Sequence, residues 1–321
     1  MEDIGNFIEQ LLSGDRRAVA RAISLVENDS VLSREILKKI YGRTGKAYRV
    51  GITGPPGAGK STLTNKLAKL YRTQKKKVGI IAVDPTSPFT GGALLGDRVR
   101  MNEVELDEGV FIRSMASRGS LGGLSKRAKE AADVLDAAGY DVVLMETVGV
   151  GQSELDIAGA ADTTVVVLVP ESGDGIQAMK AGLMEIADFF VLNKADRPGA
   201  EQAVMSLKMI LGFRAHDAES WLPEVVRTQA NNGIGIDEVA SFIQRHRSFL
   251  EGNGALELRR KARLEGRIRE LIDDILHTDF WNNERLSELH KKLELVLQRQ
   301  SNPYDVAAGL INDFRSRTGK T

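Results

Sequence analysis

Apolar and polar residues follow two different periodicities along the 321-residue chain, and the periodicity changes near residues 48 and 250. Between these points, short apolar runs rich in Val and Ile alternate with longer stretches of helical periodicity. The runs are RVGIT, VGIIAV, VFIR, DVVLME, TTVVVLV, FFVLN and VVRTQ. Strands that are apolar throughout and separated by helices are typical of a parallel sheet covered on both faces. The pattern therefore predicts an α/β domain over residues 48–250, with a doubly wound and mostly parallel sheet.

Helical periodicity without strand signals is found on both sides of this domain. Before it, residues 15–28 place apolar side chains on one stripe behind Asp15, which is suited to cap a helix. After it, two stripes follow, formed by Leu264, Ile268, Leu271, Ile272, Ile275 and Leu276, and by Leu286, Leu289, Leu293, Val296 and Leu297. We expect an N-terminal helical extension over residues 1–47 and a C-terminal helical arm over residues 251–321. The apolar face of the arm could cover its own core or a second subunit, because a stripe alone shows only that something is buried.

The composition limits the classes of function. Lys plus Arg and Asp plus Glu both number 44, so the chain has no net charge that would steer it to nucleic acid or an anionic membrane. Met1 is followed by acidic residues instead of a basic and apolar leader, and no apolar run approaches the roughly 20 residues that span a bilayer. We therefore expect a cytoplasmic protein that binds neither nucleic acid nor membrane. The chain has no Cys and only four scattered His residues, so any bound metal should have oxygen ligands.

The sequence GPPGAGKS, residues 54–61, matches the phosphate-binding motif G-x-x-x-x-G-K-[ST] completely. It follows the strand YRVGIT and precedes the helical stretch STLTNKLAKLYR, which is the context that this motif requires. The glycines let backbone N–H groups surround phosphate oxygens, Lys60 bridges the outer phosphates, and Ser61 offers a hydroxyl to Mg²⁺. The residues expected to contact a nucleoside triphosphate are Gly54, Pro55, Pro56, Gly57, Ala58, Gly59, Lys60, Ser61 and Thr62.

Three acidic residues are candidates for the metal side of this site. DVVLMETVG is an apolar strand that ends in Glu146 and is followed by Gly149, positions suited to a metal-side carboxylate and to a backbone amide facing the γ-phosphate. Asp84 ends the strand VGIIAV, and Asp97 lies beyond the loop that follows it. Mg²⁺ usually takes one or two carboxylates, so at least one of the three should act through water or only after closure. Asp97 could instead cap the helix that begins there.

The sequence FFVLNKAD, residues 189–196, predicts a strand that runs into Asn193, Lys194 and Asp196. The carboxylate of Asp196 can accept hydrogen bonds from the N1–H and the exocyclic amine of guanine, whereas adenine would leave it unpaired. The stem of Lys194 can cover the base. The N-K-x-D pattern is short and common, but its position after a phosphate-binding loop and a strand-end carboxylate favours guanine over adenine. It also favours a switch protein over a small-molecule kinase.

Taken together, five segments resemble the MeaB/ArgK family of P-loop GTPases: GITGPPGAGKST, VDPTSPFTGGALLGDRVRM, SMASRGSLGGLS, METVGVGQSE and VLNKAD. The resemblance covers nearly the whole chain, and it implies a SIMIBI-like fold that binds GTP or GDP with Mg²⁺. By motif position it assigns Lys60 and Ser61 to the phosphates and Mg²⁺. It assigns Asp84, Asp97 and Glu146 to the metal and switch acids, and the N-K-x-D loop to guanine.

The resemblance also implies a role and partners. It implies a homodimer formed largely through the C-terminal arm. This dimer would be a G-protein chaperone that binds adenosylcobalamin-dependent methylmalonyl-CoA mutase, gates cofactor delivery and protects the mutase. A further guanine contact is expected from Gln229, Ala230 and Asn231, which stand where a Ser-Ala-Leu type of turn is usual. The alternative is a P-loop kinase of the LAO/AO (arginine/ornithine) transport system.

Hydrolysis of GTP by the isolated chain is expected to be slow and to be stimulated by the partner. Val150 stands where switch proteins carry the glutamine that orients the attacking water. Arg118, in the glycine-flanked SRGSLGG loop, is a candidate for charge stabilisation. The candidate catalytic residues are therefore Lys60, Asp97, Arg118, Glu146 and Gly149.

Overall fold

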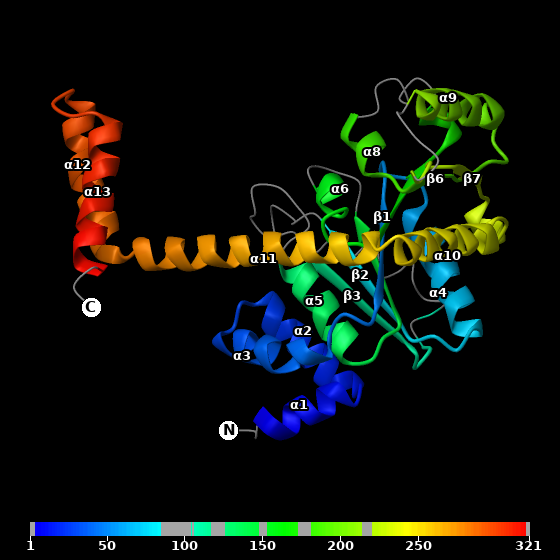
Figure 1. The fold of residues 1–321 in the computed structure, drawn as a ribbon, viewed down its shortest axis with the longest axis horizontal. Helices are drawn as coiled ribbons and strands as arrows, with labels where there is room; N and C mark the ends of the chain where they lie inside the picture. Colours follow the sequence, from blue (N-terminus) through cyan, green and yellow to red (C-terminus); the bar gives the residue numbers. More distant parts are fainter. Residues whose placement is uncertain are drawn as a thin grey trace. The chain divides into compact units, whose positions relative to one another are not determined.

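A computed structural model describes residues 4–84, 104, 106–116, 126–147, 153–172, 181–213 and 220–318. Its strands are β1 (Tyr48–Thr53), β2 (Val78–Asp84), β3 (Val110–Ala116), β4 (Val142–Thr147), β5 (Thr163–Leu168), β6 (Phe189–Leu192) and β7 (Val225–Arg227). They form one sheet in the order β3-β2-β4-β1-β5-β6-β7, and every described strand pair is parallel (Figure 1). The predicted parallel sheet is therefore confirmed.

Helices precede, connect and follow the strands. Those up to the last strand are α1 (Ile4–Leu12), α2 (Arg16–Glu27), α3 (Val31–Ile40), α4 (Lys60–Thr73), α5 (Lys126–Ala137), α6 (Ser153–Asp156), α8 (Ala181–Ile186) and α9 (Ala200–Gly212). Those after it are α10 (Ile236–Gly252), α11 (Ala255–Phe280), α12 (Asn283–Leu297) and α13 (Pro303–Thr318). Short 3-10 turns are η1 (Tyr41–Arg43), η3 (Pro170–Ser172) and η4 (Ala230–Asn232). The third C-terminal helix begins at Pro303, and proline suits this first helical position because the N–H that it lacks would be unsatisfied there anyway.

One face of the sheet packs against α4 and α10. Its core includes Ile52 of β1, Leu63 of α4 and Val239 of α10, all fully buried. Since helices lie on both faces, every residue of β1 is buried, including those whose side chains point to the other face. This burial explains why the strand sequences are mostly apolar and do not alternate regularly with polar residues.

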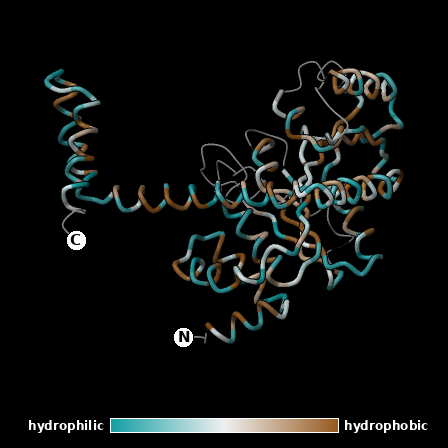
Figure 2. The backbone as a smooth tube through the Cα atoms, in the orientation of Figure 1, coloured by the Kyte–Doolittle hydropathy of each residue, from teal (hydrophilic) through white to brown (hydrophobic). Residues whose placement is uncertain are grey.

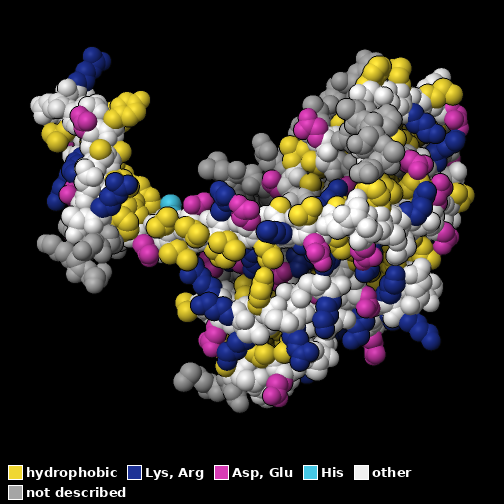
Figure 3. Space-filling model, in the orientation of Figure 1, with side chains coloured by type: hydrophobic (Ala, Val, Ile, Leu, Met, Phe, Trp, Pro, Cys, Tyr) yellow, Lys and Arg dark blue, Asp and Glu magenta, His cyan; other side chains and the backbone are white. Residues whose placement is uncertain are grey.

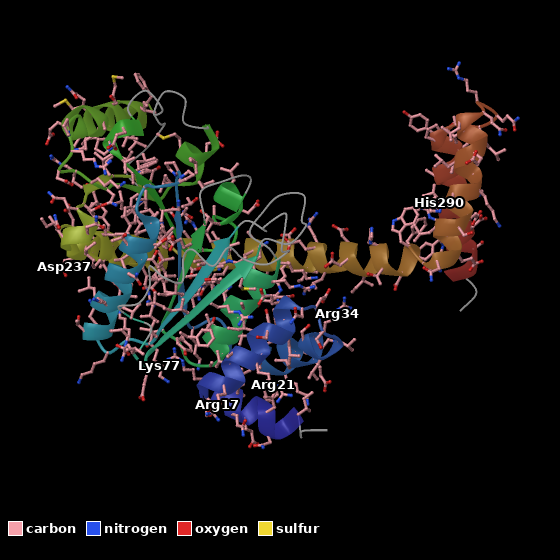
Figure 4. The ribbon with its side chains drawn as sticks, turned by 180° about the vertical axis from the view of Figure 1, so that it is seen from behind. Arg17, Arg21, Arg34, Lys77, Asp237 and His290 are labelled. Carbon is pink, nitrogen blue, oxygen red and sulfur yellow. The ribbon has the colours of Figure 1, made fainter. Side chains whose placement is uncertain are left out.

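The other face packs against α5, α9 and the three N-terminal helices. Ile23 of α2, Ile36 of α3 and Met145 of β4 belong to one buried cluster with α5. Helix α2 begins where predicted, because the Asp15 side chain accepts a hydrogen bond from the backbone N–H of Ala18 at 2.8 Å. The outer faces of α2 and α3 carry the exposed side chains Arg17, Arg21 and Arg34 (Figure 4). Residues 4–43 thus form a helical layer with a buried side and a charged side.

The chain divides into two compact units, Met1–Glu257 and Leu258–Thr321. In the second unit, α12 and α13 pack along each other, and Val306 and Leu310 of α13 are buried. Helix α11 has no buried residue, although brown and teal segments alternate along it in Figure 2 and apolar side chains follow it in Figure 3. Among the described helices, none combines the length and apolar character needed to cross a bilayer.

Candidate nucleotide site

The phosphate-binding motif forms the turn between β1 and α4. Gly54, Gly57 and Gly59 have φ angles of 131°, 73° and 89°, in the left-handed region that favours glycine. A Cβ atom on Gly54 would lie 2.1 Å from the backbone oxygen of Val167, and one on Gly59 would lie 2.3 Å from the side-chain nitrogen of Asn193. Both glycines are therefore required by backbone conformation and by space.

Lys60, the first residue of α4, is held against this loop. Its Nζ atom donates hydrogen bonds to the carbonyl oxygens of Gly54 at 2.7 Å and Pro55 at 2.9 Å. Lys60 is only 5% exposed, so its positive charge lies within the loop, next to the N-terminus of α4 with its partial positive charge. This arrangement suits an anionic phosphate chain. Pro56 and Ala58 complete the loop, and Thr62 lies in the first turn of α4.

Ser61 and Glu146 are brought together by the strand order. Strand β4 lies directly beside β1, with Ile52 paired to Glu146, and the strand end therefore reaches the first turn of α4. The Ser61 hydroxyl donates a hydrogen bond to Glu146 Oε1 at 2.5 Å, and Glu146 is 5% exposed. Hydroxyl and carboxylate oxygens are hard ligands of the kind that Mg²⁺ takes together with phosphates and waters. The pair therefore fits one Mg²⁺.

The remaining predicted metal-side and catalytic residues are placed only in part. Asp84 ends β2, whose residue Val83 pairs with Thr147 of β4, so the ends of these strands are adjacent. Asp97, Arg118 and Gly149 lie outside the described residues, and their roles stay predictions. Within the described ranges, no three acidic or His side chains gather into a group that could hold a metal ion by itself.

Asn193 joins the base-reading loop to two other parts of the site. Its Nδ2 atom donates a hydrogen bond to the carbonyl oxygen of Ala58 in the phosphate loop at 2.9 Å. Its Oδ1 atom accepts from the hydroxyl of Thr228 and from the backbone N–H of Ala230, each at 3.0 Å. The side chain is 3% exposed, so these bonds are shielded from water. Asn193 is thus a buried junction of three loops.

Lys194 and Asp196 extend from this junction. Lys194 has a φ angle of 57°, and its Nζ atom donates to the carbonyl oxygen of Gly57 at 2.8 Å. Its side chain therefore bridges the base-reading and phosphate loops, and its covering of a base stays a prediction. Asp196 is exposed at the tip of the same loop, where its carboxylate is accessible to a ligand.

The loop after β7 lies beside the base-reading loop. Ala230 is 1% exposed and bonded to Asn193, whereas Asn231 is exposed. The backbone N–H of Gln229 donates to the carbonyl oxygen of Ile234 at 3.1 Å, which closes the loop on itself. The structure therefore brings the loop of Gln229, Ala230 and Asn231 next to Asn193, and a contact with guanine stays a prediction.

Two arginines next to the base-reading loops are each paired with a glutamate. Arg197 pairs with Glu171 of η3, and Arg227 pairs with Glu201 of α9. The hydrogen bond from Arg197 holds the pKa of Glu171 below its ordinary value. These pairs are about half exposed and screened, so they add little to stability.

Three buried threonines contribute to the site without having been predicted from the sequence. Thr228 orients Asn193, and the hydroxyl of Thr53 is 2.9 Å from that of Thr147. Each lies at or just beyond the end of an apolar strand, immediately before a loop of the site. A hydroxyl in that position is a usable signal, because a buried hydroxyl needs a partner and the partner is then usually part of the same site.

The phosphate loop follows β1, the carboxylate of Glu146 lies at the end of β4, and the base-reading loop follows β6. All three therefore lie at the carboxyl ends of parallel strands, where α/β sheets bind their ligands. These features define a P-loop nucleotide-binding protein. The model of the family described as methylmalonyl Co-A mutase-associated GTPase MeaB matches residues 19–285. The chain belongs to this MeaB/ArgK family of GTPases, which confirms the resemblance seen in the sequence motifs.

Individual relatives cover nearly the whole chain. A protein of Pyrococcus abyssi is 50% identical over 97% of this chain and 97% of its own length. The Mus musculus protein named methylmalonic aciduria type A homolog, mitochondrial, is 33% identical over 96% of this chain and 78% of its own length. The crystal structure of a LAO/AO transport system kinase is similar with a TM-score of 0.72, at 30% identity and 97% coverage of both chains.

Proposed function

We propose that the protein is a Mg²⁺-dependent GTPase that binds an adenosylcobalamin-dependent methylmalonyl-CoA mutase, gates delivery of its cofactor and protects it. The observation that carries the nucleotide part is the Asn193 junction, which ties the base-reading loop to a phosphate loop whose Ser61 meets Glu146. The family description names a GTPase associated with this mutase, and the mouse relative is named for methylmalonic aciduria. These names support the proposed client.

In this proposal each candidate residue has a defined task. Lys60 bridges the outer phosphates, and Ser61 and Glu146 hold Mg²⁺ from the protein side. The ion neutralises charge on the phosphates when it is bound. Asp84 and Asp97 assist the metal shell through water or after closure, while the amide of Gly149 and the side chain of Arg118 act on the γ-phosphate.

The guanine assignment is tested with Asp196→Asn. The variant replaces a two-fold acceptor with a group that presents a donor, so we expect weaker GTP binding and a relaxed preference for GTP over ATP. Competition titration against a fluorescent guanine nucleotide measures both. Glu9→Gln, on the exposed side of α1, removes a carboxylate far along the chain and should leave both values unchanged. Full discrimination in Asp196→Asn would refute the guanine reading.

The coupling to the mutase is tested by GTP turnover. We expect a kcat well below one per second for the lone protein and a large increase with the mutase, since groups supplied in trans can raise such rates by about 10³ to 10⁵. The assay compares turnover with and without an adenosylcobalamin-dependent mutase at saturating GTP. A fast lone enzyme, or a mutase that neither binds nor stimulates, would refute this part of the proposal.

We also propose that the active form is a cytoplasmic homodimer formed through the C-terminal arm. Helix α11 exposes Leu264, Ile268, Ile272, Ile275 and Leu276 at between 41% and 57%. The second unit also contains an apolar cavity of about 320 Å³, lined by Phe280, Trp281, Leu289, Leu293, Val296, Pro303, Val306, Ala307, Leu310 and Ile311. A continuous exposed apolar stripe together with an apolar cavity favours burial against another copy.

A kinase acting in an arginine or ornithine transport system is the second candidate, because the structural relative with a TM-score of 0.72 is named as a LAO/AO transport system kinase. The two functions differ in the fate of the γ-phosphate. With γ-labelled GTP, a GTPase releases free phosphate, whereas a kinase transfers the label to a second protein. Label on an arginine- or ornithine-binding protein would favour the kinase.

A further inference from the structure

The two strands that carry the phosphate loop and the metal-side acid are joined by a pair of buried hydroxyls. Thr53 is the last residue of β1 and directly precedes Gly54, whose carbonyl oxygen accepts from Lys60. Thr147 is the last residue of β4 and directly follows Glu146. The two hydroxyl oxygens are 2.9 Å apart, and both threonines are 0% exposed.

This hydrogen bond lies where the backbone pairing of the strands stops. The register between β1 and β4 runs from Tyr48 and Val142 to Ile52 and Glu146, and the hydroxyl pair continues the link one residue further. Successive side chains of a strand point to opposite faces, so Thr147 lies on the face opposite Glu146. The pair therefore links the strand ends on the face of the sheet opposite the Glu146 side chain, which bonds Ser61.

We propose that the Thr53–Thr147 pair is a positioning element that fixes the distance between the phosphate loop and the Glu146 carboxylate, and thereby the affinity for the Mg²⁺ of the nucleotide complex. The proposal rests on the GTPase function proposed above. Residues that orient a metal ligand from behind typically change metal affinity by about 10- to 100-fold when they are removed. A pair that only fills space in the core would have no such effect.

Three variants separate these two roles. Thr53→Val and Thr147→Val each remove the hydrogen bond between the two hydroxyls, which lowers stability as well as disturbing the strand ends. The double variant Thr53→Val/Thr147→Val replaces both hydroxyls with apolar groups of the same shape, so most of the stability returns while the link between the strands remains absent. Stability is followed as the midpoint of thermal unfolding of the full chain.

The decisive readout is binding, not turnover. We titrate Mg²⁺ into protein with a fluorescent, non-hydrolysable GTP analogue and measure the Mg²⁺ concentration that gives half-maximal tightening. In the double variant this concentration should rise by about tenfold, with nucleotide affinity in excess EDTA unchanged. Thr147→Ser, which keeps the hydroxyl, should stay close to wild type. Tyr48→Phe is the matched control: it removes a buried hydroxyl that is 2.6 Å from Thr163 at the opposite end of β1, and should not change the Mg²⁺ requirement.

The outcomes distinguish this inference from the proposed function. If wild type shows Mg²⁺-dependent tightening and the double variant requires the same Mg²⁺ concentration, the positioning role is wrong and the GTPase proposal stands. If Tyr48→Phe raises the requirement as much as the double variant does, the effect is one of general stability and the positioning role is again wrong. If wild type shows no effect of Mg²⁺, both proposals fail. A raised requirement confined to the variants lacking the Thr53–Thr147 bond supports the inference.

Discussion

The helical additions at the two ends of the chain have the same kind of sequence but different surroundings. Helix α2 buries five of its residues, Ala18, Val19, Ala22, Ile23 and Val26, against the rest of its unit. Helix α11 is more than twice as long, with 26 residues, and buries none of them. Both have an apolar stripe at helical spacing. An amphipathic pattern therefore predicts the helix and its apolar side, but not whether the covering surface belongs to the same chain.

The physical reason lies in what each helix meets. The N-terminal layer packs on α5 and the sheet, and ion pairs fix it there: Arg113 of β3 pairs with Glu27 of α2, and Arg127 of α5 pairs with Asp29. The other helices of the unit that holds most of α11 are α12 and α13, and their buried residues include Val306 and Leu310 of α13. Most of the stripe of α11 is left at the surface. The contrast between these two regions can be tested by substitution.

The largest effect is expected from Ile23→Ala. Ile23 is 0% exposed in the cluster that α2 shares with α5, and removing a buried Ile side chain costs about 2–5 kcal/mol of unfolding free energy. Chemical denaturation measures this value. Ile268→Ala on α11, where the side chain is 57% exposed, is the matched control and should cost much less in a dilute sample. Equal losses of unfolding free energy in the two variants would show that α2 and α11 do not differ in how much their apolar side chains contribute to stability.

A smaller effect is expected from Ile272→Glu, and it should appear in assembly instead of folding. If the stripe of α11 is buried between two copies, a charge at this position should raise the dissociation constant of the homodimer by about 10- to 100-fold. Light scattering over a dilution series measures that constant. Asp273→Asn alters the neighbouring, polar side of the helix and should leave it unchanged. An undisturbed dimer in Ile272→Glu would show that α11 is not the interface.

The smallest effect is expected from Asp29→Asn. Its partner Arg127 is 21% exposed and Asp29 is 53% exposed, so screening should limit the loss to about 1 kcal/mol or less. Asn tolerates the φ angle of 51° at this position, and the backbone should not be strained. A double-mutant cycle with Arg127→Gln isolates the pair. Glu35→Gln, which breaks the exposed pair with Lys39, is the control. A coupling energy of several kcal/mol would show that the N-terminal layer depends on ion pairs more than on apolar burial.

Much of the fold follows from the sequence because its signals are local. The apolar runs locate the strands, the phosphate motif locates the turn between β1 and α4, and Pro303 marks the start of α13. The order of the strands in the sheet depends instead on contacts between segments that are far apart in the sequence. It places β4 between β2 and β1, and this order is what brings Glu146 to Ser61.

The limits of prediction at the site have the same origin. The junction at Asn193 joins residues 135 positions apart, and the hydroxyl pair joins residues 94 positions apart. No periodicity within one segment reports such contacts, so the strand-end positions of Thr53, Thr147 and Thr228 can be noted in the sequence but their partners cannot. Asp97, Arg118 and Gly149 were selected by motif, and they stay predictions.

Asn193 also has a thermodynamic consequence for how the two halves of a nucleotide bind. Because one buried side chain contacts both the phosphate loop and the loop after β7, ordering either loop restricts the other. Occupancy of the base side should therefore reduce the entropy lost when the phosphate side is filled, and the reverse must hold to the same degree. Guanosine and tripolyphosphate, added as separate molecules, should each bind more tightly in the presence of the other. Independent binding of the two fragments would show that the loops are ordered separately.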